Sequence, residues 1–139
     1  MSIVLDTNVV SALRVPARNP EVAQWAATFP IDALYVAAPM IAEIERGVVA
    51  RERTDPPSGA VLRTWLDDHV LEAFRGRVLP FDLEAARCLG RYKIPAEAPL
   101  DDALIAAIAD SYDFTVATRN TKHFAKLPVK VTNPWEYSA

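Results

Sequence analysis

The sequence predicts an α/β fold, with a small central parallel sheet flanked by helices. Short apolar runs rich in β-branched residues alternate along the chain with longer segments of helical periodicity. That alternation is expected of parallel strands joined by helices, because parallel neighbours need a crossover connection. The length of 139 residues fits one compact unit, so we expect residues 1–139 to form a single domain.

The first half of the chain contains two predicted strands and three predicted helices. Residues 2–5 form an apolar run that predicts a buried strand. A helical segment follows Asp6 and is stopped by Pro16. Residues 19–28 are expected to form a helix with proline at its first position, and residues 34–37 a strand. Residues 39–53 are expected to form a helix with one apolar face.

The second half continues the alternation after the clearest turn signal in the chain. Residues 54–59 contain two prolines, a serine and a glycine, which is typical of a turn and too short for a linker between domains. Beyond it we expect a helix over residues 61–74, a short strand or extended link over 77–80 and a helix over 82–92. A loop with two prolines over residues 94–99 leads to a strongly apolar helix over 101–112. Two strands follow, over residues 114–118 and 129–132.

Composition weighs against some classes of protein. The chain has 15 basic and 18 acidic residues and a net charge of −3, which is not typical of a nucleic-acid binder, although bound cations offset the charge of an acidic site. The one cysteine, Cys88, excludes an intrachain disulfide and fits a buried apolar position. No signal peptide and no run of about 18 apolar residues is seen. We therefore expect a cytoplasmic protein that does not enter a membrane.

An acidic residue stands directly after the first predicted strand. Asp6 lies at the carboxyl end of that strand, and this is the edge of a parallel sheet where ligands bind. Thr7 and Asn8 follow it and add polar groups. The same three residues also suit the start of a helix, because all of them are good capping residues. Capping and ligand binding do not exclude each other, so Asp6 remains a candidate.

Two more acidic positions are candidates for the same edge. Glu43 lies early in the helix of residues 39–53, and Gly47 leaves space one turn along. The alternative for Glu43 is a solvated side chain. Asp101 and Asp102 open the most apolar helix, where acids are also favoured by the helix dipole. Helical periodicity does not choose between these two at a helix terminus.

Neutral polar residues follow the fourth predicted strand. Thr118 and Asn120 offer oxygen atoms for a cation or its bound water. His123 is expected to be a partly buried surface residue rather than a base. No serine–histidine–acid or cysteine–histidine set is evident in the sequence.

Carboxylates gathered at one edge of a sheet point to a divalent cation. Like charges about 4 Å apart repel by several kcal/mol at intermediate dielectric, so such a cluster is costly unless a cation binds there. Mg²⁺ and Mn²⁺ prefer oxygen ligands. These ions lower the pKa of an attacking water and stabilise charge on a phosphate.

Four segments carry a pattern that is shared with a known family. They read Ile-Val-Leu-Asp-Thr-Asn, Ala-Glu-Ile-Glu-Arg-Gly, Asp-Ala-Leu-Ile-Ala-Ala and Ala-Thr-Arg-Asn, over residues 3–8, 42–47, 102–107 and 117–120. In this order they resemble the VapC-type toxins, which are PIN-domain ribonucleases of bacterial toxin–antitoxin pairs. Two further stretches, over residues 75–82 and 133–135, are similar to the FitB-like subgroup. The resemblance covers nearly the whole chain.

The resemblance implies both a PIN-domain-like fold and a function. It implies that Asp6, Glu43 and Asp102 hold Mg²⁺ or Mn²⁺, with Asn120 among the catalytic residues. It also implies endonucleolytic cleavage of RNA, a homodimer, neutralisation by a cognate antitoxin, and contact with DNA only through that antitoxin. It selects Asp102 over Asp101, because the family aspartate stands three residues before Ile-Ala-Ala. Many members carry an acid where this chain has Asn120, which leaves a second metal site open.

Two other functions remain open at this stage. A catalytically weak PIN-like module would bind RNA or a protein partner, and Asn120 is the feature that favours it. A phosphoryl-transfer domain would use Asp6 as its nucleophile together with Mg²⁺, but no lysine stands in an obvious motif for that chemistry. Nothing in the sequence names the RNA target.

Overall fold

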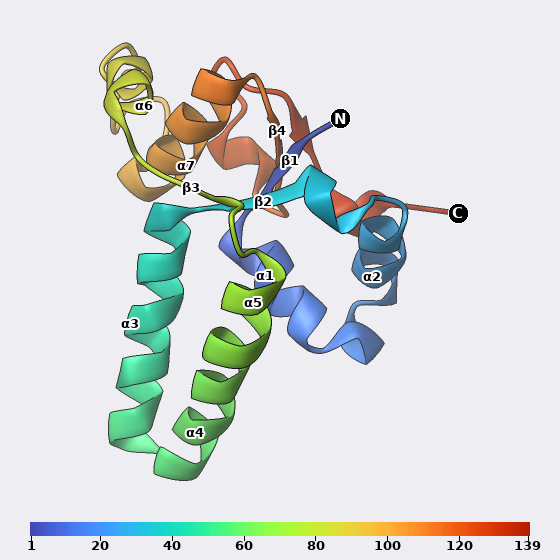
Figure 1. The fold of residues 1–139 in the computed structure, drawn as a ribbon. Helices are drawn as coiled ribbons and strands as arrows, with labels where there is room; N and C mark the ends of the chain where they lie inside the picture. The colour runs from blue at the N-terminus through green and yellow to red at the C-terminus, as the bar shows by residue number, and fades with distance from the viewer.

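The computed structural model describes residues 1–139, and its centre is a five-stranded parallel sheet (Figure 1). The strands are β1 (Ile3–Leu5), β2 (Leu34–Ala37), β3 (Val78–Leu79), β4 (Thr115–Ala117) and β5 (Val131–Thr132). Their spatial order is β3-β2-β1-β4-β5, and every neighbouring pair is parallel. The predicted fold class is confirmed, and β1 is its central strand.

Helices connect the strands and lie on both sides of the sheet (Figure 1). They are α1 (Thr7–Arg14), α2 (Pro20–Ala27), α3 (Ala38–Thr54), α4 (Pro56–Thr64), a π-helical segment (Trp65–Val70), α5 (Leu71–Ala73), α6 (Leu83–Leu89) and α7 (Leu100–Tyr112). Short 3₁₀ segments cover Pro16–Arg18, Ile31–Ala33, Thr121–His123 and Pro134–Glu136.

Successive residues of the central strand enter two separate cores. The side chains of Ile3 and Leu5 pack with the helices α1, α2 and α3 on one face, whereas Val4 packs with α6 and α7 on the other. All three side chains are fully buried. Because helices cover both faces, the strand is apolar along its whole length instead of alternating between apolar and polar residues.

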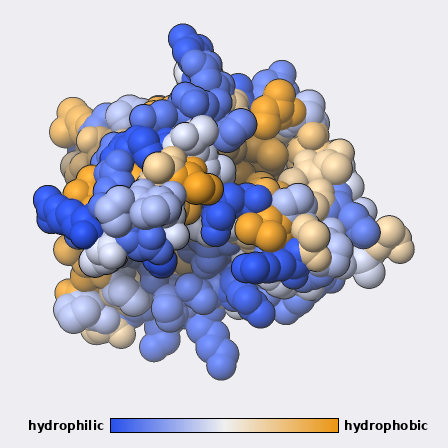
Figure 2. Space-filling model, turned by 90° about the horizontal axis from the view of Figure 1, so that it is seen from below, coloured by the Kyte–Doolittle hydropathy of each residue, from blue (hydrophilic) through white to orange (hydrophobic).

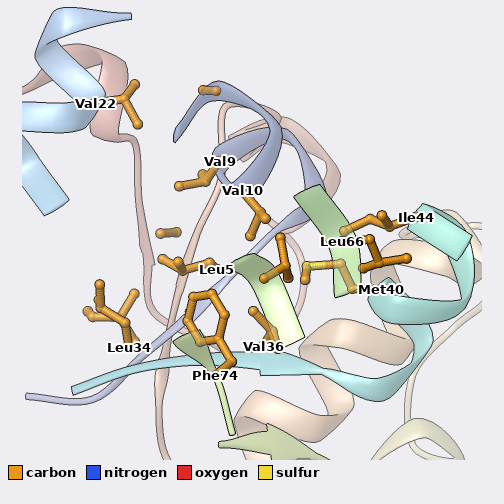
Figure 3. Packing of buried hydrophobic residues seen from close by; sticks show 14 of the residues in the cluster. Leu5, Val9, Val10, Val22, Leu34, Val36, Met40, Ile44, Leu66 and Phe74 are labelled. Carbon is orange, nitrogen blue, oxygen red and sulfur yellow. The ribbon is translucent and has the colours of Figure 1, made fainter. Parts of the chain in front are cut away.

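The larger core lies where α1, α3 and the π-helical segment meet the sheet (Figure 3). Met40 and Ile44 of α3 lie beside Leu66 of the π-helical segment, and Phe74 lies beside Val36 of β2. Met40 and Leu66 are fully buried. Each such side chain contributes about 1.5–3 kcal/mol to stability by leaving water, so this core fixes α3 and the site residue it carries.

The turn predicted over residues 54–59 is wrong in its extent, because α4 begins at Pro56. Proline is tolerated in the first turn of a helix, where its missing N–H would have no partner. Asp55 caps the helix and accepts hydrogen bonds from the N–H and hydroxyl of Ser58 at 3.5 and 2.7 Å. Gly59 marks a close crossing of α3 and α4, since a Cβ there would lie 2.5 Å from the Cα of Glu52.

The other predicted elements are confirmed with shifted ends. The helix predicted over residues 61–74 is one helical run that contains the π-helical segment. The last strand begins at Val131 rather than at residue 129. None of the helices combines the length and the apolar character needed to span a membrane.

Candidate metal centre

The first part of the candidate site is the junction of β1 and β4. Asp6 directly follows β1, and its N–H donates a hydrogen bond of 2.9 Å to the carbonyl of Ala117. This bond extends the β1–β4 pairing by one residue and brings Asp6 beside Thr118, the residue after β4. Asp6 is 4% exposed and Thr118 is fully buried. The parallel pairing therefore places two residues far apart in the sequence at one carboxyl edge.

Three donors orient the Asp6 carboxylate. Oδ1 accepts from the N–H of Thr7 at 2.8 Å, and Oδ2 accepts from the Thr118 hydroxyl at 2.8 Å and from Asn8 Nδ2 at 3.4 Å. Asp6 thus caps α1 as the sequence predicts, and its second oxygen faces β4. Burial raises the pKa of Asp6, the bonds from Thr118 and Thr7 oppose that rise, and the negative charge of Asp102 adds to it.

Glu43 reaches this junction from α3. Its Oε2 accepts a hydrogen bond of 2.9 Å from the hydroxyl of Thr7, the neighbour of Asp6. The side chain is exposed, so solvent and ligands have access to it. A Cβ at Gly47, one turn along, would meet nothing within 4 Å, which agrees with the open space that the sequence suggests.

Asp102 reaches the same site from the first turn of α7. Its side chain is 16% exposed, and Oδ2 lies 2.8 Å from Nδ1 of His123. Burial raises the pKa of Asp102, the hydrogen bond and charge of His123 lower it, and the charges of Asp101 and Glu43 raise it. Asp102 therefore interacts through its charge with both Glu43 and Asp6. Asp101 is instead exposed, and it lines a small hollow with Glu43.

The neutral polar residues differ in how tightly they are held. Asn8 donates to Asp6 and Thr118, and its Oδ1 accepts from the N–H of Arg119 at 3.2 Å. Asn120 is exposed and only its backbone is bound: its N–H donates to the Thr118 hydroxyl at 3.0 Å, and its carbonyl accepts from the N–H of His123 at 3.0 Å. Its side chain does not cap the following 3₁₀ segment. The Asn120 amide therefore stands at the site without a protein partner.

His123 is the site residue that sequence reasoning missed. The sequence predicts a partly buried surface position for His123, and its side chain is 48% exposed, but its ring also contacts Asp102 directly. The next residue in the sequence could have indicated this position, because Phe124 has a large aromatic side chain, which is fully buried in the structure. Because Phe124 packs in the core, the neighbouring His123 lies close to the edge of the sheet.

The chemistry of these side chains suits a divalent cation. The three carboxylates and the hydroxyl and amide groups beside them are oxygen donors of the kind that Mg²⁺ and Mn²⁺ prefer. In the present side-chain arrangement, however, no three acidic, histidine or cysteine side chains lie close enough to hold an ion together. Thr7 binds one oxygen of Glu43 and His123 binds one oxygen of Asp102, and the other oxygen of each carboxylate has no protein donor. An ion that keeps several of its waters needs few direct protein ligands, so the residues fit such an ion.

Comparison with known proteins identifies the family. The PIN-domain family matches residues 3–130. The chain belongs to the PIN-domain family. The five-stranded parallel sheet and its flanking helices are the PIN-domain fold.

The similar proteins confirm the resemblance to VapC-type and FitB-like members. The chain is 37% identical to VapC ribonuclease Y4jK of Sinorhizobium fredii over 96% of this chain and 98% of that protein. It is 35% identical to Toxin FitB of Neisseria gonorrhoeae over the same shares of the two chains. Among solved structures, FitAB bound to a DNA fragment matches with a TM-score of 0.88 and 32% identity, over 99% of this chain and 98% of that one.

Proposed function

We propose that this PIN-domain protein is a Mg²⁺- or Mn²⁺-dependent endoribonuclease, the toxin of a type II toxin–antitoxin pair. The observation that carries the proposal is that Thr7 joins two acids at the carboxyl edge of the sheet, because its N–H donates to Asp6 Oδ1 and its hydroxyl donates to Glu43 Oε2. Burial raises the pKa of Asp6, and the charge of nearby Asp102 adds to that rise. Two acids brought into one low-dielectric neighbourhood are costly to the fold unless a cation binds between them. Relatives that are named ribonucleases and toxins support the same reading.

Each proposed ligand has a separate structural support. Asp6, Glu43 and Asp102 hold the cation directly or through water. When bound, the ion supplies an activated water and stabilises charge on the phosphate. Thr118 and Asn8 keep the Asp6 carboxylate in one orientation through their hydrogen bonds. Asn120 contributes an unbound amide to the substrate or to a ligand water.

An apolar pocket supports the proposed antitoxin partner. A cavity of about 380 Å³ opens between α1, α2 and the helical run after α4, and 11 of its 13 lining residues are hydrophobic. Val10, Phe29 and Trp65 are among them. Figure 2 shows that the underside of the molecule is mostly hydrophilic, with apolar side chains in separate patches. We propose that an apolar antitoxin segment fills this pocket and that the same antitoxin sends an arginine to the acidic site.

The remaining partners follow from the same proposal. The FitAB structure holds a DNA fragment, and for this chain we propose contact with DNA only through the antitoxin. We also propose that the free toxin is a homodimer. RNA remains the proposed substrate, with its target sequence set by surfaces around the site.

One observation favours a second function, a catalytically weak module that binds RNA or protein. Asn120 offers a neutral oxygen where many family members carry a carboxylate, and its side chain is bound to nothing. A site with three carboxylates attracts a second cation less strongly than a site with four.

A nuclease assay separates the two functions. Purified protein is incubated with single-stranded RNA in Mg²⁺, in Mn²⁺ and in excess chelator, beside Asp102→Asn as a matched control. We expect internal cleavage that needs the metal and is lost in the variant. Binding of RNA without cleavage in either metal would favour the weak module instead.

A further inference from the structure

The histidine at the acidic site is bound in one defined way. His123 Nδ1 lies 2.8 Å from Oδ2 of Asp102. An ionised carboxylate only accepts hydrogen bonds, so Nδ1 is the donor. Oδ1 of Asp102 and Nε2 of His123 take no part in this hydrogen bond.

Both partners are fixed by the same core. Asp102 precedes Ala103, and His123 precedes Phe124; these two neighbours are fully buried in the core beneath α7. The backbone of the histidine is held further by its N–H, which donates to the carbonyl of Asn120 at 3.0 Å. The ring therefore approaches the carboxylate from a fixed direction.

The bond is also the one protein hydrogen bond that the Asp102 carboxylate accepts. Asp6, in contrast, accepts three, from Thr7, Asn8 and Thr118. Removal of one donor leaves Asp6 oriented by the other two. Removal of His123 leaves the Asp102 side chain free to rotate about its own bonds.

We propose that His123 is a positioning residue for Asp102. The imidazole engages one carboxylate oxygen, fixes the plane of the group and presents the other oxygen to the divalent cation. This inference rests on the proposed metal site. Partners of this kind, which orient a metal ligand without touching the metal, typically change metal affinity about 10- to 100-fold when they are removed.

The test is calorimetric titration of metal-free protein with Mn²⁺ in the absence of RNA. His123→Ala is expected to bind Mn²⁺ about 10- to 100-fold more weakly than the parent. His123→Asn is expected to bind within a few-fold of the parent, because the asparagine Nδ2 stands at nearly the same place as the imidazole Nδ1. His69→Ala is the matched control, since it removes the other histidine of the chain, and it should leave the Mn²⁺ affinity unchanged.

The outcomes separate this inference from the proposed function. Parent-like or tighter Mn²⁺ binding by His123→Ala would overturn the positioning role, and so would equal weakening in His123→Ala and His123→Asn. Failure of the parent itself to bind Mn²⁺ would overturn the metal site and the inference with it. Melting temperatures of the metal-free variants, measured alongside, show whether a loss of affinity accompanies a loss of fold, and unfolding of His123→Ala with no rescue by His123→Asn would count against the proposal.

Discussion

The hydroxyl of Thr118 donates a hydrogen bond of 2.8 Å to the carboxylate of Asp6, across 112 residues of sequence. Both groups are buried, and each directly follows a strand of the same parallel pair. The strand pairing alone places the two residues side by side, and the hydrogen bond then fixes the orientation of the acid.

Thr118→Val should weaken both stability and metal binding. Valine keeps the shape of threonine but takes a hydrogen-bond donor from a buried carboxylate, which costs about 1–3 kcal/mol of unfolding free energy. Urea denaturation of the metal-free protein measures that cost, and Mn²⁺ titration measures the affinity. Thr115→Val is the control, because Thr115 is buried in β4, the strand that Thr118 follows, but lies outside the site. Equal stability losses in the two variants would contradict the role of this hydrogen bond.

Asp6→Asn should abolish metal-dependent cleavage and raise the stability of the metal-free protein. The loss of a metal-binding carboxylate should reduce cleavage more than about 100-fold, because about 100-fold is the upper end of the effect of removing a group that only supports a ligand. Because burial raises the pKa of Asp6 in the folded state, ionisation of this carboxyl opposes folding. The protonated Asp6 carboxyl therefore stabilises the fold fully below its ordinary pKa of about 4. This stabilisation is lost as the pH rises through the pKa of Asp6 in the folded protein.

Melting temperatures in chelator therefore test the same variant without any activity assay. The parent should melt below Asp6→Asn at neutral pH, and the gap should close as the pH falls through the folded pKa of Asp6. A gap that is independent of pH would show that ionisation of Asp6 does not destabilise the fold.

Asn120→Asp should tighten metal binding, chiefly at a second position. The parent is expected to hold one well-occupied ion and a second one weakly, because three carboxylates attract a second cation less than four do. The added charge should also lower the stability of the metal-free protein through like-charge repulsion. Mn²⁺ calorimetry decides the matter: the same stoichiometry and the same affinity in parent and variant would refute this account.

Binding of the antitoxin should remove Mn²⁺ binding by the toxin. A guanidinium matches carboxylate geometry with paired hydrogen bonds and replaces the charge of the cation. Titration of the purified complex should therefore show no Mn²⁺ binding, and replacement of the inserted antitoxin arginine by alanine should restore it. A complex that binds Mn²⁺ as tightly as the free toxin would exclude an arginine at Asp6, Glu43 or Asp102.

Two glycines of the α3–α4 region should respond in opposite ways to the same substitution. Gly59→Ala forces a Cβ to within 2.5 Å of the Glu52 backbone, and crowding of this kind costs about 1–3 kcal/mol. Gly47→Ala meets nothing within 4 Å and should gain about 1 kcal/mol from its better helix propensity. Urea denaturation of both variants provides the comparison, and a stable Gly59→Ala protein would show that the two helices are not closely apposed.

The sequence predicted the fold class and nearly every helix because burial and periodicity are local signals. The error at residues 54–59 has a physical cause: two prolines stop a helix in its interior but start one in its first turn. Whether these prolines end a helix or begin one depends on Asp55, which caps α4, and its hydrogen bonds to Ser58 cannot be read from the residue types alone.

The candidate site was less completely predicted than the fold. Asp6 stands out as an acid at the end of a strand, and Glu43 and Asp102 were selected through the resemblance to VapC-type toxins. The bond between His123 and Asp102 depends instead on the packing of Phe124. No periodicity reports such a contact between a 3₁₀ segment and the start of α7. The spatial order of the strands, which makes β1 central, also follows from long-range pairing rather than from any local pattern.

The central place of β1 has a consequence for how the protein is made. β1 is synthesised before its partner β4, which begins only at Thr115. Pairing across so long a stretch of chain has to wait for synthesis of β4, since loop closure cannot precede the second strand. Until then, Asp6 has neither Thr118 beside it nor Asp102 oriented by His123. A nascent chain thus carries all three acids before Thr118 and His123 are made, while the proposed site is still unassembled.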